Sequence, residues 1–282
     1  MRVKDYMATP VWVVERNEPI QRARNLMFKH DISRLPVMDK GKLVGIVTKY
    51  DISNRLAQAA PEWRRRPIDR IPVQLVMTEN PITIYPDATL TQAAELMMEN
   101  EIDGLPVEKD GELVGIITSR DLLKYFAQQN LDSKVGDLMA EGMVSVHRHH
   151  TIAHVVEQMN LHGVSRVLVY EDNMRPVGVI TRSNLTFAGI FDSFDQPRMK
   201  SIKMTRKEST AGRKQYRYIK QVPLVAEDIM SSPIIAARVD DRAVDDAKVL
   251  VEKSICGMPV IENDSMVGFF STREIVAEIG RW

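Results

Sequence analysis

Hydrophobic and polar residues change period in a fixed order between residues 81 and 127. Residues 81–85, PITIY, alternate as a short strand does, and apolar residues between 90 and 97 then recur at the spacing of one helix face. Two apolar segments, 104–108 and 113–118, flank a Lys-Asp-Gly turn and predict a β-hairpin. A second helix is predicted from 121 through about 127. The predicted order is strand, helix, strand, strand, helix.

Most of this pattern occurs four times along the chain of 282 residues. LVGIVTKYD at 43–51 returns as LVGIITSRD at 113–121, with the glycine, threonine and aspartate in register. Shorter copies occur as VGVIT at 177–181 and VGFFS at 267–271. Each copy follows an apolar lead segment that ends in a methionine, and these are Met7, Met77, Met139 and Met230. Ordered elements at matching spacings identify an internal repeat.

A unit of about 55 residues is too short to bury both of its helices, so the units are expected to pack in pairs. The predicted fold class is α/β (α+β), with four β-α-β-β-α repeats paired into two modules. The two modules could close on each other within one chain or pair with a second chain as a homodimer, and the sequence does not decide between these. The predicted boundaries are 1–58 for repeat 1, 59–72 for a linker, 73–128 for repeat 2, 129–190 for repeat 3, 191–225 for a basic insertion and 226–282 for repeat 4.

The four copies share the lead methionine, a Leu/Met-Pro-Val segment or its variant, a VGxxT or VGxxS strand and a closing polar residue. In these features they resemble cystathionine β-synthase (CBS) domains, which pair as Bateman modules. Two tandem modules in one chain are similar in architecture to the gamma subunit of AMP-activated protein kinase. The resemblance implies a regulatory protein whose repeats bind adenosine compounds: AMP, ADP, ATP, S-adenosylmethionine or methylthioadenosine. No cofactor is required in such a protein, because the adenosine nucleotide acts as a regulatory ligand.

The residues at the end of each VGxxT strand suit such a ligand chemically. A carboxylate at a helix start can accept hydrogen bonds from both ribose hydroxyls, and Asp51 and Asp121 hold that position. Thr48 and Thr118, three residues earlier, lie with the helix N-terminal amides where a phosphate can bind. The alternative is that each Thr-x-x-Asp pattern is only an N-terminal cap of its own helix.

Odd and even repeats differ near the start of the Pro-Val segment. Repeats 1 and 3 have Arg34 and Arg166, whereas repeats 2 and 4 have Gly104 and Gly257. The resemblance implies that the basic residue approaches ligand phosphates and that the small residue leaves space for a base. The predicted nucleotide site of the first module therefore comprises Arg34, Thr48, Asp51, Thr83, Gly104, Pro106, Thr118, Arg120 and Asp121.

The second module departs from this pattern. Asn184 lacks the charge of the aspartate, Leu168 replaces the proline, and Glu274 carries its carboxylate one methylene further from the backbone. Ligand binding is therefore expected to be weaker there. The candidate residues of the second module are Arg166, Thr181, Asn184, Ser271 and Arg273.

Positive charge is concentrated in residues 197–221, which contain nine Lys or Arg against one Glu, a charge of +8. Because the whole chain balances 38 basic against 38 acidic residues, the remainder carries −8. The alternation in SIKMTR and QYRYIK around an STAG turn predicts a β-hairpin with its tyrosines on one face. Such a hairpin either binds nucleic acid through phosphate contacts and base stacking or is a solvated edge kept soluble by lysines. The candidate nucleic-acid contacts are Arg213, Lys214, Tyr216, Arg217 and Tyr218.

Four histidines, at 147, 149, 150 and 154, raise the question of a metal site. Their spacing does not require them to converge, and no acidic or cysteine ligand is near them in sequence, so no metal site is predicted. The single cysteine, Cys256, excludes an internal disulfide and a Cys-x-x-Cys site. Cys256 is expected to be a small buried hydrophobic residue.

The sequence does not favour an enzyme. It has no GxGxxG, P-loop, HExxH or GxSxG motif, and the repeats leave no room for a catalytic barrel, which needs about 250 residues. No apolar run approaches the roughly 18 residues that span a membrane, and the first ten residues lack an apolar signal stretch, so a cytoplasmic location is expected. Three functions stay open: an adenosine sensor with an unknown protein partner, a nucleic-acid-associated protein, and a scaffold or dimerisation module with empty sites.

Overall fold

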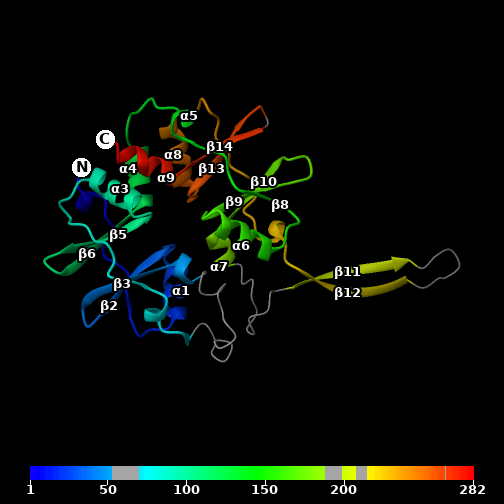
Figure 1. Cartoon of the computed structure of the whole chain (residues 1–282), viewed down its shortest axis with the longest axis horizontal. Helices are drawn as coiled ribbons and strands as arrows, with labels where there is room; N and C mark the ends of the chain where they lie inside the picture. The colour runs from blue at the N-terminus through cyan, green and yellow to red at the C-terminus, as the bar shows by residue number, and fades with distance from the viewer. Residues whose placement is uncertain (53–69, 188–198, 208–214, 264) are drawn as a thin grey trace. The chain divides into compact units, whose positions relative to one another are not determined.

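The computed structural model describes residues 1–282 except 53–69, 188–198, 208–214 and 264. The chain divides into two compact units (Figure 1). Unit 1 comprises Met1–Met143 and Ile234–Trp282, and unit 2 comprises Val144–Pro233. Four repeats of mixed α/β structure make up these units, as the hydrophobic pattern predicts.

Repeat 2 illustrates how one repeat is built. Its elements are η4 (Val73–Leu75), β4 (Thr78–Glu79), α3 (Leu90–Glu99), β5 (Gly104–Lys109), β6 (Glu112–Thr118) and α4 (Ser119–Ala127). Helix α3 begins with a reciprocal cap, in which the Thr89 hydroxyl accepts from the Gln92 amide at 3.1 Å and the Gln92 side chain accepts from the Thr89 amide at 2.9 Å. The β5–β6 turn uses Gly111 with φ of 82°, a left-handed conformation that favours glycine.

The other repeats follow the same order. Repeat 1 has η1 (Val3–Asp5), β1 (Val14–Glu15), α1 (Ile20–Lys29), β2 (Arg34–Asp39), β3 (Lys42–Thr48) and the helical residues 49–52. Repeat 3 has α5 (Val135–Leu138), β7 (Ala140–Glu141), β8 (Ser145–His147), α6 (Ile152–Leu161), β9 (Arg166–Tyr170), β10 (Pro176–Thr181) and α7 (Arg182–Phe187). Repeat 4 has η5 (Ala226–Asp228), α8 (Ala243–Glu252), β13 (Gly257–Glu262), β14 (Ser265–Ser271) and α9 (Thr272–Ile279).

The strand predicted at 81–85 is wrong. Within that segment only Ile84 forms a β-bridge, a parallel one with Val107. The Ile84 amide donates to the Pro106 carbonyl and the Ile84 carbonyl accepts from the Glu108 amide, both at 3.0 Å. Prolines at 81 and 86 flank the segment and have no amide hydrogen, which limits the ladder to this one bridge.

Each lead segment packs on the other repeat of its pair, not on the repeat that follows it in sequence. The lead of repeat 2 adds β4 to the edge of β3, and the lead of repeat 1 forms the Ala8–Ile116 bridge with β6. Likewise β7, which precedes repeat 3, pairs with β14 of repeat 4, and Ser231, which precedes repeat 4, bridges Val179 of repeat 3. The hydrophobic pattern within one repeat does not predict this exchange, in which each lead segment packs on the other repeat of its pair.

The exchange explains the glycine of each VGxxT or VGxxS strand. The four contacts are Met7 on Gly115, Met77 on Gly45, Met139 on Gly268 and Met230 on Gly178. A Cβ atom built on Gly45 would lie 2.7 Å from Sδ of Met77, which is closer than real Cβ atoms approach other heavy atoms. The repeated lead methionine and the repeated glycine are thus two sides of one contact, made between different repeats.

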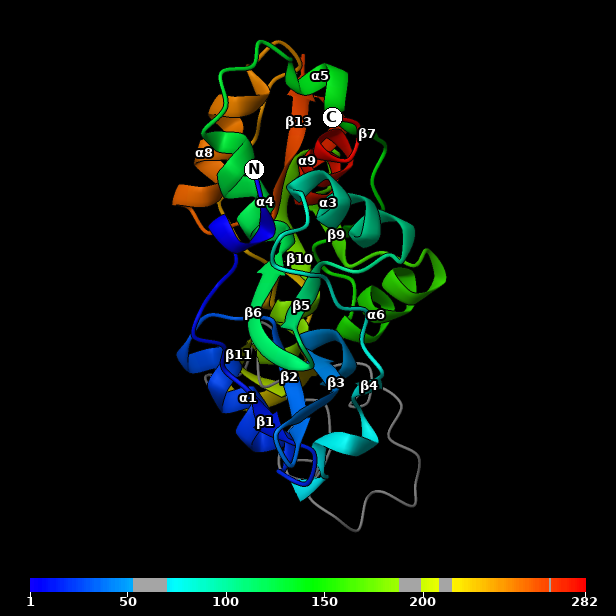
Figure 2. The same cartoon turned by 90° about the vertical axis from the view of Figure 1, so that its left-hand side faces the viewer.

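Unit 1 contains two apolar cores. One belongs to repeat 1 and includes Ile71 and Val73 from the lead of repeat 2. The other joins repeats 2 and 4, because α4 packs against α8 and α9 while α3 packs against α9 (Figure 2). In unit 2 the core of repeat 3 includes Ala226 and Ile229 from the lead of repeat 4. Every core therefore depends on chain contributed by a second repeat.

The basic insertion forms the predicted hairpin, of which the strand backbones are described. Strand β11 (Met199–Lys207) pairs antiparallel with β12 (Gln215–Pro223), both yellow in Figure 1. The register puts Arg206 opposite Tyr216 and Met204 opposite Tyr218, so the two tyrosines belong to one face, as predicted. The STAG turn at 209–212 and the candidates Arg213 and Lys214 lie outside the described residues.

Candidate functional site

The arginine or glycine that distinguishes odd from even repeats lies directly across its hairpin from the threonine or serine at the strand end. The four pairs are Arg34–Thr48, Gly104–Thr118, Arg166–Thr181 and Gly257–Ser271. Directly opposed residues of an antiparallel pair are neighbours on one face. Each repeat therefore presents one corner where this residue, the strand end and the start of the second helix meet. In unit 1, β3 packs beside β6, which brings the corners of repeats 1 and 2 together.

Both aspartates of this corner close the first turn of their own helix. Oδ2 of Asp51 accepts hydrogen bonds from the Thr48 amide and hydroxyl at 2.7 Å each, and Oδ2 of Asp121 accepts from the Thr118 amide at 3.0 Å and hydroxyl at 2.7 Å. The capping alternative is thus present, but it uses only one oxygen of each carboxylate. Oδ1 of Asp121 lies 3.3 Å from Nζ of Lys124, and Oδ1 of Asp51 has no partner among the described residues.

Arg34 connects the two repeats. A Cβ atom built on Gly104 of repeat 2 would lie 2.5 Å from Nη1 of Arg34 and 3.0 Å from its Cδ, so the guanidinium occupies the space that the glycine leaves. Nη2 of Arg34 lies 3.6 Å from Oδ2 of the exposed Asp103. Nε is buried and has no hydrogen-bond partner among the described residues. A buried donor in this state costs about 1–3 kcal/mol, which a hydrogen-bond acceptor would recover.

At this corner, burial and the attraction between opposite charges shift the pKa values of Arg34 and Asp51 in opposite directions. Burial lowers the pKa of the Arg34 guanidinium, while the charges of Asp103 and Asp121 act to raise it. Burial raises the pKa of the Asp51 carboxyl, while the Thr48 hydrogen bonds and the Arg34 charge act to lower it. The Arg34 guanidinium therefore interacts electrostatically with both predicted ribose carboxylates, Asp51 of repeat 1 and Asp121 of repeat 2.

Arg120 links three repeats of unit 1. Its Nη1 donates to Oδ2 of Asp31 in repeat 1 at 3.2 Å, and its Nη2 donates to the Ser254 carbonyl of repeat 4 at 3.2 Å. The Arg120 side chain is 39% exposed, so a ligand can still reach it. The sequence motif singled out Arg120 for its place beside Asp121. Its bridge to Asp31 and Ser254 joins residues far apart in sequence, and no pattern signalled it.

The candidates of the second module already have other partners. Oδ1 of Asn184 accepts from the Thr181 amide at 2.8 Å and hydroxyl at 2.7 Å, while its Nδ2 donates to the Ile229 carbonyl at 3.1 Å and the Ser231 hydroxyl at 3.3 Å. Asn184 therefore holds the exchanged lead of repeat 4 in place. Arg166 occupies the equivalent place to Arg34 in β9.

In repeat 4 the closing residues also bond to each other. Ser271 is 3% exposed, and its hydroxyl donates to Oε2 of Glu274 and accepts from the Arg273 amide. Nη2 of Arg273 lies 3.9 Å from Oε1 of Glu101. The Ser271 hydroxyl is therefore already paired within its own helix start, whereas the Arg273 side chain is exposed.

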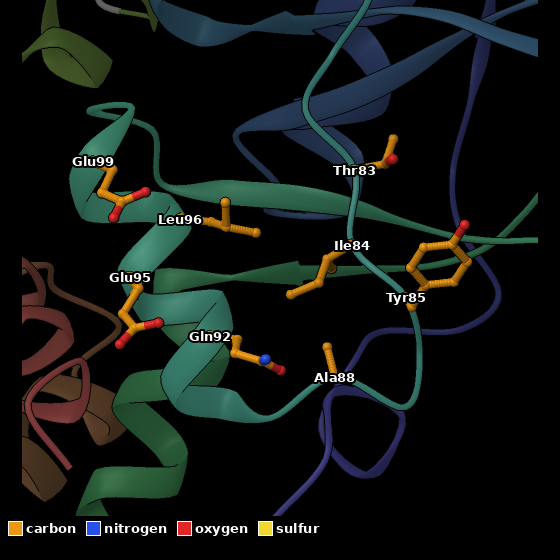
Figure 3. Close-up of a pocket in the computed structure, with 8 residues that line it drawn as sticks. All are labelled: Thr83, Ile84, Tyr85, Ala88, Gln92, Glu95, Leu96 and Glu99. Atoms are coloured by element: carbon orange, nitrogen blue, oxygen red, sulfur yellow. The ribbon is translucent and has the colours of Figure 1, made fainter.

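Thr83 lies in the wall of an open pocket of 360 Å³. Figure 3 shows the pocket between the extended segment that carries Thr83 and one face of α3. Glu95 and Glu99 on α3 line it and would repel a phosphate. Pro106 is buried in β5, where its carbonyl holds the Ile84 amide. Thr83 and Pro106 stay predicted members of the ligand site.

The four histidines gather more closely than their spacing indicates. The ring centroid of His147 lies 5.1 Å from that of His149 and 5.9 Å from that of His150, which lies 4.4 Å from that of His154. Nε2 of His147 lies 2.9 Å from Oδ1 of Asp172. Burial, together with the nearby His154 and His147, lowers the pKa of His150. Within the described part of the chain, no group of three or more His, Cys, Asp or Glu could hold a metal ion.

The expectation that Cys256 is buried is wrong, because its side chain is exposed. Cys256 lies in the loop before β13, and its carbonyl accepts a hydrogen bond from the Thr272 amide at 3.0 Å. Residue type alone ranks cysteine among the buried residues and cannot register that this one falls in a loop.

Comparison with known proteins agrees with this architecture. The sequence pattern of the CBS domain family matches residues 3–58, 68–128, 135–189 and 225–281, so the chain belongs to the CBS domain family and contains four CBS domains. The uncharacterized protein MJ1404 of Methanocaldococcus jannaschii is 25% identical over 283 residues, which cover 98% of this chain and 61% of that protein. This chain therefore spans less than two thirds of the length of that relative.

A solved structure shows the same fold over nearly the whole chain. Protein MJ1225 of Methanocaldococcus jannaschii, described as a proposed archaeal homolog of g-AMPK, superimposes with a TM-score of 0.79 at 20% identity over 99% of both chains. The CBS domain pair of protein MJ0100, in complex with 5′-methylthioadenosine and S-adenosyl-L-methionine, is 34% identical over 46% of this chain and 98% of that one, with a TM-score of 0.41. None of the described helices is long and apolar enough to cross a lipid bilayer.

Proposed function

We propose that this protein is a non-catalytic sensor that binds an adenosine nucleotide in its first module, at the corner shared by repeats 1 and 2. The proposal rests on the surroundings of Arg34. Its guanidinium fills the space beside Gly104, and its buried Nε has no hydrogen-bond acceptor among the described residues. A phosphate oxygen would supply that acceptor and a charge opposite to the guanidinium. Oδ1 of Asp51 would accept hydrogen bonds from ribose hydroxyls, and Oδ1 of Asp121 would do so in exchange for its contact with Lys124.

The choice within the adenosine class follows from this chemistry. AMP, ADP and ATP carry phosphates, whereas methylthioadenosine carries no anionic group and S-adenosylmethionine carries a carboxylate beside its cations. Because the Arg34 guanidinium is a buried cation whose Nε lacks an acceptor, the phosphorylated compounds should bind most tightly. The CBS pair of MJ0100 takes non-phosphorylated adenosine compounds, and the preference proposed here rests on the residues of this chain alone.

Signalling would follow from differential binding. A ligand that contacts Arg34 of repeat 1 and Asp121 of repeat 2 favours the arrangement in which both are in reach, and it shifts the equilibrium only by its difference in affinity for the two arrangements. Arg120 lies beside Asp121 and bonds to Asp31 and to Ser254 of repeat 4. A phosphate that competes for Arg120 would weaken these two bonds, and a protein partner would detect the change at repeat 4.

A melting screen of the whole chain with AMP, ADP, ATP, S-adenosylmethionine and methylthioadenosine tests the proposal. A ligand present at about 100 times its Kd adds about 2.7 kcal/mol, which raises the Tm by roughly 5–10 °C for a chain of this size. The shift should be lost in Arg34→Ala and in Asp51→Ala combined with Asp121→Ala.

The matched control is Asn184→Ala, which removes the equivalent helix cap in repeat 3. Asn184→Ala should lower the Tm of the free protein and keep the ligand-induced shift. No shift with any adenosine compound would instead favour the scaffold function. A shift that Asn184→Ala abolishes and Arg34→Ala retains would move the site to the second module.

A further inference from the structure

The β11–β12 hairpin is a positively charged element that the ligand site does not use. The strands carry six cations: Lys200, Lys203, Arg206, Lys207, Arg217 and Lys220. Across the ladder each of them faces an uncharged residue; for example, Lys203 is opposite Ile219 and Arg217 is opposite Thr205. No position of the ladder pairs one of these cations with an acidic residue, and the two strands together carry a charge of +6. The rest of the chain, with a charge of −8, would repel a polyanion that the hairpin attracts.

The foot of the hairpin is fixed to repeat 3 within unit 2. Nζ of Lys200 lies 2.6 Å from Oδ1 of Asp228 in η5. The residues that follow β12 bond to the turn before α6, where the Ala226 amide donates to the His150 carbonyl at 2.8 Å and Nη2 of Arg148 lies 2.6 Å from Oε2 of Glu227. The hairpin is therefore attached at a defined place, and the cation nearest its foot is already paired.

The register sorts the remaining cations onto both faces of the ladder. Arg206 and Lys220 share the face of Tyr216 and Tyr218, whereas the other face carries Lys203, Lys207 and Arg217. A flat anionic surface such as a lipid bilayer neutralises one face of a ribbon. A groove bounded by two phosphate strands neutralises both, and the major groove of a duplex admits a two-stranded β-ribbon. Tyrosines on one face add a surface on which bases can stack.

We infer that the β11–β12 hairpin is a nucleic-acid-binding surface, in which cations on both faces contact phosphates and the tyrosine face contacts bases. This surface is independent of the nucleotide site at Arg34. It would attach the sensor to a nucleic acid while the first module responds to its adenosine ligand. The inference rests on the two strands alone.

Fluorescence anisotropy of the whole chain with a labelled DNA duplex, an RNA duplex and a single-stranded RNA tests the inference. The first variant combines Lys203→Gln, Lys207→Gln and Arg217→Gln, which remove charge and keep side-chain length. It should weaken binding by about tenfold or more and reduce the slope of log K against log salt by about 2–3. The matched control removes three exposed lysines elsewhere, with Lys40→Gln, Lys42→Gln and Lys109→Gln. The control should leave both the affinity and the salt slope unchanged.

A second pair of variants tests the tyrosine face. Tyr216→Ala with Tyr218→Ala should weaken single-stranded binding, while the corresponding Phe variants, which keep the rings, should restore it. Melting curves establish that each variant is folded. Three results would overturn the inference: no binding to any nucleic acid at low salt, equal losses in the hairpin variant and the lysine control, or binding only to phosphatidylserine vesicles.

Discussion

Gly104→Ala is the most discriminating small change for the site, because it adds one methyl group where Gly104 of repeat 2 contacts Arg34 of repeat 1. The new Cβ would lie 2.5 Å from Nη1 of Arg34, whereas ordinary van der Waals contact begins at 3.4 Å. The guanidinium must therefore retreat by about 1 Å, which is enough to break hydrogen bonds to a ligand. Since a hydrogen bond to a charged group contributes about 1.5–3 kcal/mol, the nucleotide affinity should fall roughly 10- to 100-fold.

Isothermal titration of four proteins measures this effect: wild type, Gly104→Ala, Arg34→Ala and the double variant. If the glycine matters only through Arg34, Gly104→Ala should have little further effect in the Arg34→Ala background. Gly45→Ala is the control, because its Cβ would meet Met77 and the Thr78 carbonyl instead of Arg34. It should lower the Tm and keep the affinity. Additive losses in the double variant, or full affinity in Gly104→Ala, would show that the glycine does not act on the ligand through Arg34.

Three further predictions concern stability and pH. Gly115→Ala should lower the free energy of unfolding in denaturant by about 1–3 kcal/mol, because its Cβ would meet Met7. The loss should be smaller in a Met7→Ala background. An equal loss in both backgrounds would contradict the contact between the lead segment of repeat 1 and strand β6 of repeat 2. Burial raises the pKa of Asp246 to about 6 from 3.8, and its buried Oδ2 has no hydrogen-bond partner among the described residues. The raised pKa destabilises the folded state fully above pH 6 and not at all below pH 3.8. Asp246→Asn should therefore raise the free energy of unfolding by about 1 kcal/mol at pH 7, after allowance for solvent screening, and this gain should vanish toward pH 4. Melting curves across this pH range measure the gain, and a gain that grows in acid would contradict the prediction. Burial also raises the pKa of Asp51. As the pH is lowered, the nucleotide affinity should therefore begin to fall at a higher pH than it would if the pKa of Asp51 were that of an ordinary aspartate. Titrations of wild type and Asp51→Asn at matched pH should show this part of the pH dependence only in wild type.

The repeat was predictable from sequence because its signals are local. Turn residues such as Gly111, the cap at Thr89 and the period of α3 each act over a few positions, and all of them appear in the structure. The segment at 81–85 failed for a local reason too, since the prolines at its ends restrict the ladder to one bridge at Ile84. Alternating apolar residues indicate which side is buried and do not establish that a strand is paired.

The contacts between repeats could not be predicted from one sequence. Met77 on Gly45 and Arg34 on Gly104 join residues 32 and 70 positions apart, and hydrophobic periodicity specifies only which face of an element is buried. The Thr-x-x-Asp motif identified Asp51 and Asp121 as site candidates. It could not show that one oxygen of each is already used in a cap, nor that Arg120 bonds to repeats 1 and 4.

A crystal structure of the whole chain with the adenosine compound that gives the largest melting shift would locate the ligand. The phosphate should lie within hydrogen-bond distance of the Arg34 guanidinium, and ribose hydroxyls should contact Asp51 or Asp121. A ligand held only by repeats 3 and 4, or one bound in the pocket lined by Glu95 and Glu99, would show that the Arg34 corner is not the nucleotide site.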